Sequence, residues 1–273
     1  MSGLYVIATP IGNLEDISLR ALRLLKQVEL IAAEDTRTTR QLLNAYGIKT
    51  PLTSYHQYNK RTKLGYLLDC LEEKDVALVS EAGMPGLSDP GYELIVAAIE
   101  RGIPVVPVPG ASAAITALVI SGLPTNQFLY LGFLPRRSGA RRRLLQSVAD
   151  EPWTLVAFEA PHRLLETLED ARQILGDRNV AVARELTKVH EEVFRGKLSQ
   201  AVTHFVQPRG EFTLVIEGKI PVEPVINEQI EKELFRLHQQ GTGAKRAVSL
   251  LSQASGISKK ALYQAWLRLT QGA

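Results

Sequence analysis

Short apolar runs alternate along the chain with longer segments in which apolar residues recur every three or four positions. The short runs predict strands at residues 4–8, 28–33, 76–80, 103–108, 128–133, 154–159, 180–185 and 212–218. The longer segments predict helices at residues 17–26, 36–46, 59–73, 91–101, 111–121, 139–149, 162–175 and 198–206. This alternation is typical of an α/β fold, and such apolar strands suit largely parallel sheets that are covered on both faces.

Two proline-containing stretches interrupt this alternation, GLPTN at 122–126 and IPVEP at 220–224. Proline resists the continuation of both helix and sheet, so each stretch has the composition of a linker. We therefore predict an α/β domain over 1–123, a second α/β domain over 124–220 and a third piece over 225–273.

The third piece carries no strand pattern, and its spacing predicts helices at 227–240, 244–254 and 259–270. Small Ser252, Gly256 in the turn, apolar Ile257 and capping Ser258 resemble a helix-turn-helix. The alternative is a three-helix packing module whose lysines only face solvent.

Charge is distributed unevenly, although the formal net charge is only +3. Residues 227–273 hold seven Lys and Arg against three acids, and RRSGARRR at 136–143 holds five arginines. Uneven basic charge suggests a polyanionic partner. The start of the sequence shows no secretory pattern and no apolar run is long enough to span a membrane, so a cytoplasmic enzyme is expected.

Four predicted strands are followed by loops that could carry chemistry: residues 9–18, 33–43, 80–91 and 106–114. Loops at the carboxyl ends of strands in an open sheet line the usual ligand crevice. The first loop has one glycine in TPIG where a pyrophosphate-binding turn needs several, so an NAD-dependent enzyme is the weaker alternative.

The second half contains two further clusters of ionisable residues after predicted strands. One holds Glu159, His162 and Arg163. The other holds six ionisable residues in twelve positions, which suggests a polar cleft or a dimer contact; they are Arg184, Glu185, Lys188, Glu191, Glu192 and Arg195. The histidines lack metal-ligand spacing, and no serine stands on a nucleophile elbow, so neither metal nor covalent catalysis is expected.

Taken in order, these motifs resemble the ribosomal RNA small-subunit methyltransferase I family, a branch of the tetrapyrrole methylase superfamily. The similarity covers nearly the whole chain, and AEDTRTT and SEAGMPGLSDPG are its most specific parts. The resemblance implies two α/β domains with an S-adenosylmethionine cleft between them, usually in a homodimer. It also implies methyl transfer to the ribose 2′-hydroxyl of a cytidine in the decoding region of 16S ribosomal RNA.

The resemblance also implies the cofactor-binding residues. Gly83, Met84 and Pro85 correspond to a Gly-Asp-Pro pattern of the superfamily, and Met84 in place of the acid favours backbone contacts. A Pro-Gly-small-Ser pattern corresponds to Pro109, Gly110 and Ser112. Five further residues are implied by their position relative to the family pattern alone: Pro10, Ile11, Leu87, Ala160 and Thr213. Ala113 completes the predicted set.

The cofactor already carries an activated methyl group, so the protein must chiefly align it with the ribose oxygen. A carboxylate or lysine could accept the hydroxyl proton; the candidates are Glu34, Asp35, Glu159, Glu185 and Lys188. Alignment alone is the alternative. Basic residues are expected to contact RNA; these are Arg37, Arg136, Arg137, Arg141, Arg142, Arg143, Arg163, Lys245, Arg246, Lys259 and Lys260.

Two other functions remain open at this point. A small-molecule methyltransferase acting on a tetrapyrrole-like ring would share the fold, but its substrate would not need the basic segments. A DNA-binding regulator would use the helix-turn-helix as its reader and the α/β body as a sensor.

Overall fold

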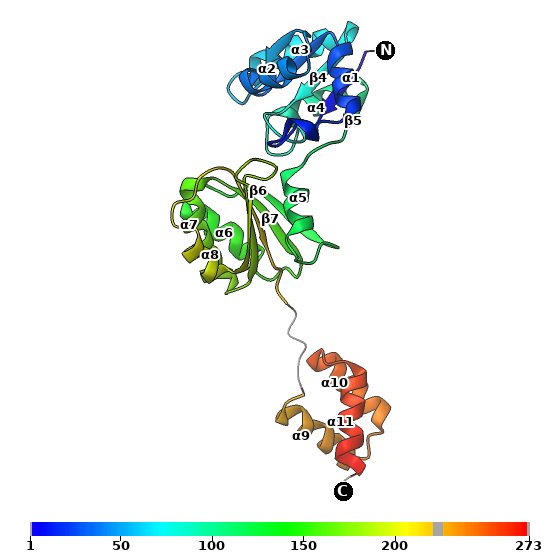
Figure 1. Ribbon diagram of the computed structural model, residues 1–273. Helices are drawn as coiled ribbons and strands as arrows, with labels where there is room; N and C mark the ends of the chain where they lie inside the picture. Colours follow the sequence, from blue (N-terminus) through cyan, green and yellow to red (C-terminus); the bar gives the residue numbers. More distant parts are fainter. Residues whose placement is uncertain (1, 221–225, 272–273) are drawn as a thin grey trace. The chain divides into compact units, whose positions relative to one another are not determined.

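A computed structural model describes residues 2–220 and 226–271 of the chain (Figure 1). The chain forms two compact units, Met1–Lys219 and Ile220–Ala273. Most of the linker predicted at 220–224 lies outside the described residues. The α/β class of the larger unit and the all-helical character of the smaller one are confirmed. The boundaries at 123 and 220 remain a prediction. No helix among the described residues is both long and apolar enough to cross a bilayer.

The first sheet of the larger unit is parallel throughout. Its strands, in the spatial order β3-β2-β4-β1-β5, are β1 (Leu4–Ile7), β2 (Leu30–Ala33), β3 (Leu52–Ser54), β4 (Val76–Val79) and β5 (Val105–Val108). Successive side chains alternate between two cores: Ile31 packs with α1 (Leu19–Gln27) and α2 (Thr36–Ala45), and Leu30 packs with α3 (Lys60–Glu73) and α4 (Gly91–Glu100). Pro107 lies in β5, where an edge position tolerates its missing donor.

The second sheet has the order β6-β7-β10-β8-β9 and is mostly antiparallel. Its strands are β6 (Phe128–Phe133), β7 (Thr154–Glu159), β8 (Asn179–Arg184), β9 (Glu192–Lys197) and β10 (Phe212–Ile216). Only β6 and β7 run parallel, so the expectation of largely parallel strands is wrong for this sheet. The connection between β8 and β9 is too short for the crossover that parallel neighbours require.

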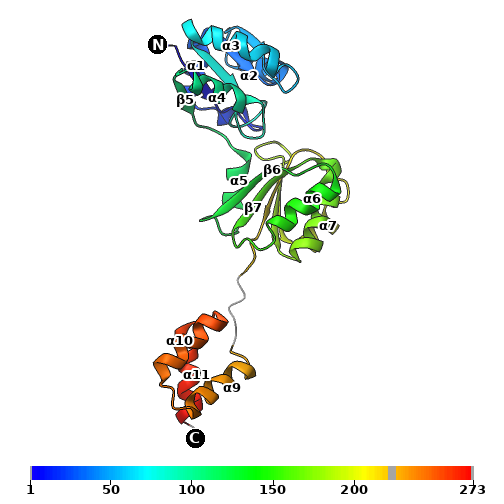
Figure 2. The ribbon, with the colours of Figure 1, turned by 180° about the vertical axis from the view of Figure 1, so that it is seen from behind.

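Helices cover both faces of this second sheet (Figures 1 and 2). One face packs against α6 (Ser138–Ser147), α7 (Leu164–Leu175) and α8 (Leu198–His204), which share a core with Leu214. The other face packs against α5 (Ala113–Ile120), whose Ala114 and Leu118 lie in one cluster with Val156 and Val215. Two short 3₁₀ helices complete the unit, η1 (Leu14–Asp16) and η2 (Pro161–Arg163).

The smaller unit consists of α9 (Glu228–Gln239), α10 (Ala244–Ser255) and α11 (Lys259–Gln271). These bounds confirm the three predicted helices to within one residue. Its core includes Leu251, Ile257 and Trp266, and Trp266 meets the His238 ring edge-on with 5.3 Å between centroids. Gly256 ends α10 with φ 71°, a conformation that costs glycine little, and the Ser258 hydroxyl accepts a hydrogen bond from the Ala261 N–H.

Candidate functional site

Three loops meet at the carboxyl edge of the first sheet, as their positions after strands predicted. Thr9 and Gly83 exchange backbone hydrogen bonds of 2.9 and 3.0 Å. Gly83 has φ 78°, and a Cβ placed on it would lie 3.6 Å from both the Ala111 carbonyl oxygen and the Ile11 side chain. The loops at 9–18, 80–91 and 109–112 therefore approach one another through backbone and small residues.

The loop at 80–91 is fixed by its own hydrogen bonds. The Asp89 carboxylate accepts from the Gly86 N–H at 2.9 Å and from the Gly91 N–H at 2.7 Å. The Ser80 hydroxyl donates to the Gly83 carbonyl at 3.1 Å. Gly86 has φ 90°, a left-handed conformation that a side chain would strain. The clustering of glycine and proline thus produces a defined shape.

A cavity of about 350 Å³ opens where the first loop meets the start of α5. We call it the loop cavity, and its lining is Ile11, Asp16, Gly110, Ala111, Ser112, Ile115, Thr116 and Thr187. A Cβ on Gly110 would lie 3.0 Å from the Ala8 Cβ, so a side chain there would crowd the end of β1. The volume falls within the range of small-molecule sites.

The predicted cofactor-binding residues have different positions relative to this cavity. Ile11, Gly110 and Ser112 line it. Pro10, Gly83, Pro109 and Ala113 are neighbours of lining residues in sequence or by contact.

The remaining predicted residues do not line the cavity. Met84 packs against the core between the first sheet and α3, Pro85 is buried, and Leu87 is half exposed. Thr213 lies in β10 beside Phe158 and Ala183, and Ala160 follows β7.

Asp16 and Thr187 line the loop cavity, although neither is among the site residues predicted from the sequence. Asp16 stands in the loop at 9–18, which follows a predicted strand. Its place in that loop is the sequence signal that could have identified it. Thr187 comes from the loop between β8 and β9, and its hydroxyl accepts a hydrogen bond from the Asn13 N–H at 3.0 Å. A Cβ on Gly12 would overlap the Lys188 side chain and lie 2.8 Å from the Thr187 hydroxyl. Gly12 therefore lets these two loops touch.

Glu34 and Asp35 follow β2 but have opposite electrostatic surroundings. The Glu34 carboxylate accepts a hydrogen bond from the Glu81 N–H at 3.1 Å, and burial raises its pKa despite this bond. Asp35 caps α2 by accepting from the Arg37 N–H at 2.7 Å and pairs with the Arg37 guanidinium at 2.9 Å. Hydrogen bonding to Arg37 lowers the pKa of Asp35 to about 2. Glu34 is consequently the better proton acceptor of the two.

Glu185 and Lys188 form an ion pair of 3.0 Å, and Lys188 also contacts Glu211 at 3.1 Å. Burial is the largest effect on Glu185 and raises its pKa, but hydrogen bonds from Lys188 and the Glu211 N–H lower that pKa overall. Burial likewise lowers the pKa of Lys188, and its bonds to Glu185 and Glu211 raise it overall. Lys188 is therefore held protonated and is poorly suited to accept a proton.

Glu159 and Arg163 are buried partners, which corrects two predicted roles. Glu159 is 2% exposed, and its carboxylate binds the Arg163 guanidinium, the Ala160 N–H and the Thr167 hydroxyl. Arg163 also donates to the Leu134 carbonyl at 2.9 Å. Because both side chains are occupied inside the protein, Glu159 is not a base at the loop cavity and Arg163 is not a surface contact for RNA.

The arginine run at 136–143 likewise contains one buried side chain among exposed ones. Arg141 is 1% exposed and pairs with Asp170 at 2.7 Å, so its predicted RNA contact is also wrong. Arg142 shares Asp170 at 3.3 Å but is half exposed. Arg136, Arg137 and Arg143 are exposed, as are Arg37, Lys245, Arg246, Lys259 and Lys260.

Comparison with known proteins gives the family. The family model described as tetrapyrrole (corrin/porphyrin) methylases matches residues 3–202. A crystal structure of diphthine synthase superposes with a TM-score of 0.64 at 14% identity, covering 80% of this chain and 90% of that one. Uroporphyrin-III-C-methyltransferase from Thermus thermophilus superposes with a TM-score of 0.55 at 21% identity, covering 80% and 94%. These structures share the fold of the larger unit.

Curated relatives named ribosomal RNA small subunit methyltransferase I are much more similar in sequence. The Halalkalibacterium halodurans protein is 48% identical over 95% of this chain and 93% of its own length. The Synechocystis protein is 46% identical over 98% and 99%. The Thermotoga maritima protein is 51% identical over its entire length, which matches 80% of this chain. The chain therefore belongs to the ribosomal RNA small subunit methyltransferase I family of tetrapyrrole methylases.

Proposed function

We propose that this protein transfers the methyl group of S-adenosylmethionine to the ribose 2′-hydroxyl of a cytidine in the decoding region of small-subunit ribosomal RNA. The observation that carries the proposal is the loop cavity, lined on one side by the small residues Gly110, Ala111 and Ser112, in a chain whose relatives are named ribosomal RNA small subunit methyltransferase I. The nucleotide and the 2′-oxygen are implied by the family resemblance, and mapping of the methylated ribose tests them.

The loop cavity fits the cofactor in its chemistry. Ile11 and Ala111 offer apolar contact, and Gly110 and Ser112 leave backbone groups accessible to a flat nucleoside. Asp16 and Thr187 offer oxygen acceptors for hydroxyl or ammonium groups. The cofactor supplies an activated methyl group when bound, so the remaining task of the protein is alignment and proton removal.

Glu34 is the residue that we propose accepts the ribose proton. It does not line the loop cavity, but its carboxylate accepts from the Glu81 N–H in the loop at 80–91, which is bonded to the cavity-lining first loop through Thr9 and Gly83. The raised pKa of Glu34 makes it a stronger base than Asp35, whose carboxylate is committed to the α2 cap and to Arg37. Glu185 and Lys188 would then act as a positioning pair that holds the loop between β8 and β9 against Gly12. Neither of these two residues needs to exchange a proton in this arrangement.

Exposed basic side chains supply the proposed RNA contacts. In the larger unit these are Arg37, Arg136, Arg137, Arg142 and Arg143, and in the smaller unit Lys245, Arg246, Lys259 and Lys260. Each cation that neutralises a phosphate releases counterions, which makes binding sensitive to salt.

Labelled S-adenosylmethionine incubated with undermethylated small subunits tests the central proposal. We expect label on a single cytidine ribose, and Glu34→Gln should lower kcat by about 10²-fold or more if Glu34 is the base. Glu73→Gln is the matched control, because this carboxylate is exposed at the end of α3 and does not contribute to the pKa shift of Glu34, so kcat should stay nearly unchanged. Label in a tetrapyrrole and none in RNA would contradict the proposal, as would duplex DNA binding without methyl transfer.

Three further expectations concern the oligomeric state, the location in the cell and the domain division. We expect a homodimer, so analytical ultracentrifugation should detect a species with twice the mass of one chain. The cytoplasm is the expected location because ribosomal subunits are the proposed substrate. The domain division at residues 123 and 220 predicts that limited proteolysis cuts within 122–126 and 220–225.

A further inference from the structure

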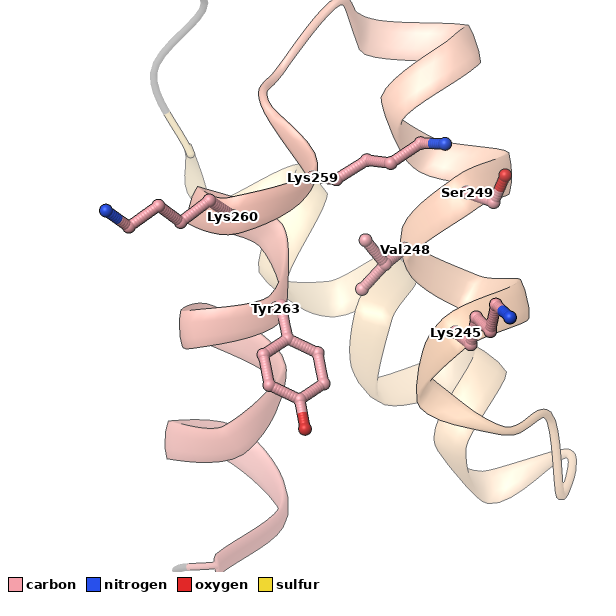
Figure 3. A pocket seen from close by; sticks show the side chains of 6 residues that line it. All are labelled: Lys245, Val248, Ser249, Lys259, Lys260 and Tyr263. Atoms are coloured by element: carbon pink, nitrogen blue, oxygen red, sulfur yellow. The ribbon is translucent and has the colours of Figure 1, made fainter.

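A second cavity, of about 560 Å³, lies in the smaller unit between α10 and α11 (Figure 3). We call it the lysine pocket, and its lining is Lys245, Val248, Ser249, Lys259, Lys260 and Tyr263. Val248 is buried, whereas the Tyr263 ring is 47% exposed. Figure 3 shows Lys259 reaching toward Ser249 on the α10 side, Lys260 extending in the opposite direction and Tyr263 between the two helices.

The charges around the lysine pocket are uncompensated. Residues 244–271 contain five Lys and Arg and no Asp or Glu. The described residues provide no ion-pair partner for Lys245, Lys259 or Lys260, whereas on α9 Lys232 pairs with Glu228 at 2.7 Å and Arg236 with Glu233 at 2.6 Å. Basic residues on α9 are thus neutralised within their own helix, and the pocket faces solvent with a net positive charge that suits an anion.

The pocket combines ammonium groups with an aromatic face and a small apolar floor. Val248 provides the floor, Tyr263 provides a ring on which a planar group can stack, and the Ser249 hydroxyl can donate or accept. A nucleotide has the complementary parts, namely a phosphate and a planar base. In a duplex the bases are stacked inside the helix, so a concave pocket of this kind can receive only an unpaired base.

We propose that the lysine pocket binds one unpaired nucleotide of RNA, with its phosphate near Lys245 and Lys259 and its base stacked on Tyr263. The inference rests on the proposed function for the identity of the polyanion. It adds a specific recognition site on a unit that is separate from the one carrying the loop cavity. Lys260 would contact a neighbouring phosphate along the strand.

Fluorescence anisotropy of the full-length chain with a labelled single-stranded oligouridine tests this inference. Tyr263→Ala should weaken binding about 5- to 150-fold, the range for loss of one base stack, and leave the salt dependence unchanged. Tyr263→Phe keeps the ring and should bind within about twofold of the unsubstituted protein. Lys245→Gln combined with Lys259→Gln should reduce the slope of log affinity against log salt by about 1.4.

The matched control is Lys232→Gln combined with Arg268→Gln. Both side chains are exposed on the smaller unit and lie outside the pocket lining and the proposed RNA contacts, so general loss of charge is reproduced without touching the pocket. The control should bind oligouridine more tightly than the pocket double variant. Equal losses in the two double variants would show that only diffuse charge is sensed and would overturn the inference.

Two further outcomes would also overturn it. Unchanged oligouridine binding by Tyr263→Ala would show that no base stacks on Tyr263. Equal competition by an RNA or DNA duplex would show that the pocket does not select unpaired bases. Circular dichroism of each variant checks that the helices remain folded. Methyl transfer to small subunits by the unsubstituted protein is measured in parallel. Absence of transfer would count against the proposed function, whereas unchanged oligouridine binding by the pocket variants would count against this inference alone.

Discussion

Arg141 and Arg143 stand two positions apart in one arginine run, yet their surroundings are opposite. Arg141 is 1% exposed and ion-paired with Asp170, whereas Arg143 is exposed on the same helix. A buried ion pair that loses one partner leaves an uncompensated charge, which makes such a truncation costly. The run therefore combines structural and surface roles that composition alone cannot separate.

Arg141→Gln should lower the free energy of unfolding of the larger unit by about 3–5 kcal/mol, because Asp170 would remain buried without its main partner. Arg143→Gln should change it by no more than about 0.5 kcal/mol, since the side chain is exposed. Urea denaturation followed by circular dichroism measures both. Equal stability of the two variants would contradict the structural role assigned to Arg141.

Asp35 gives a pH-dependent prediction. Its pKa falls from an ordinary 3.8 to about 2 through hydrogen bonding to Arg37. A lowered carboxylate pKa stabilises the folded state above the unfolded-state value, and this stabilisation disappears as pH falls through the folded value. The stability difference between the unsubstituted protein and Asp35→Asn should therefore be constant from pH 7 to about 4 and shrink toward pH 2. A difference that grows on acidification would contradict the ion pair.

At the scale of elements, the contact between the first loop and the loop after β8 depends on Gly12. Gly12→Ala would push Lys188 and Thr187 away, because the added methyl group has no room. Since Thr187 lines the loop cavity, we expect the Kd for S-adenosylmethionine to rise about tenfold or more, measured by calorimetry.

Gly65→Ala is the control for this substitution. Gly65 lies within α3 with no heavy atom within 4 Å of the added Cβ. It should leave cofactor affinity unchanged and add up to about 1 kcal/mol of stability through helix propensity. Unaltered cofactor affinity in Gly12→Ala would show that the two loops do not shape the cavity.

The sequence predicted the elements better than it predicted their pairing. Long apolar runs such as 154–159 are strands, but β3 (Leu52–Ser54) is too short to show a pattern, and β9 (Glu192–Lys197) was interpreted as part of a polar cluster. The four loops were located because glycine, proline and polar residues follow apolar runs. The contact of Asn13 with Thr187 was not predictable, because it joins residues 174 positions apart.

At the scale of the whole molecule, the two units have separate cores, and the smaller one comprises about a fifth of the chain. The Thermotoga maritima relative matches 80% of this chain over its entire length, so about a fifth of this chain has no counterpart there. A relative named ribosomal RNA small subunit methyltransferase I thus has about the length of the larger unit. Methyl transfer should accordingly need only the larger unit.

A variant ending at Lys219 should keep its affinity for S-adenosylmethionine within about twofold and bind small subunits more weakly. Its affinity should also depend less steeply on salt, because the smaller unit's cations no longer neutralise phosphates. Calorimetry and filter binding measure the two effects. Loss of cofactor binding would show instead that the smaller unit supports the loop cavity.

The edge-on packing of Trp266 against His238 has a spectroscopic consequence. The chain has two tryptophans, Trp153 in the larger unit and Trp266 in the core of the smaller one. Each unit thus contains one tryptophan, and a Trp→Phe change at either position removes the tryptophan emission of that unit. Because the Trp266 indole packs against the His238 ring in the core of the smaller unit, its emission should report on the folding of that unit, whereas that of Trp153 should report on the larger unit.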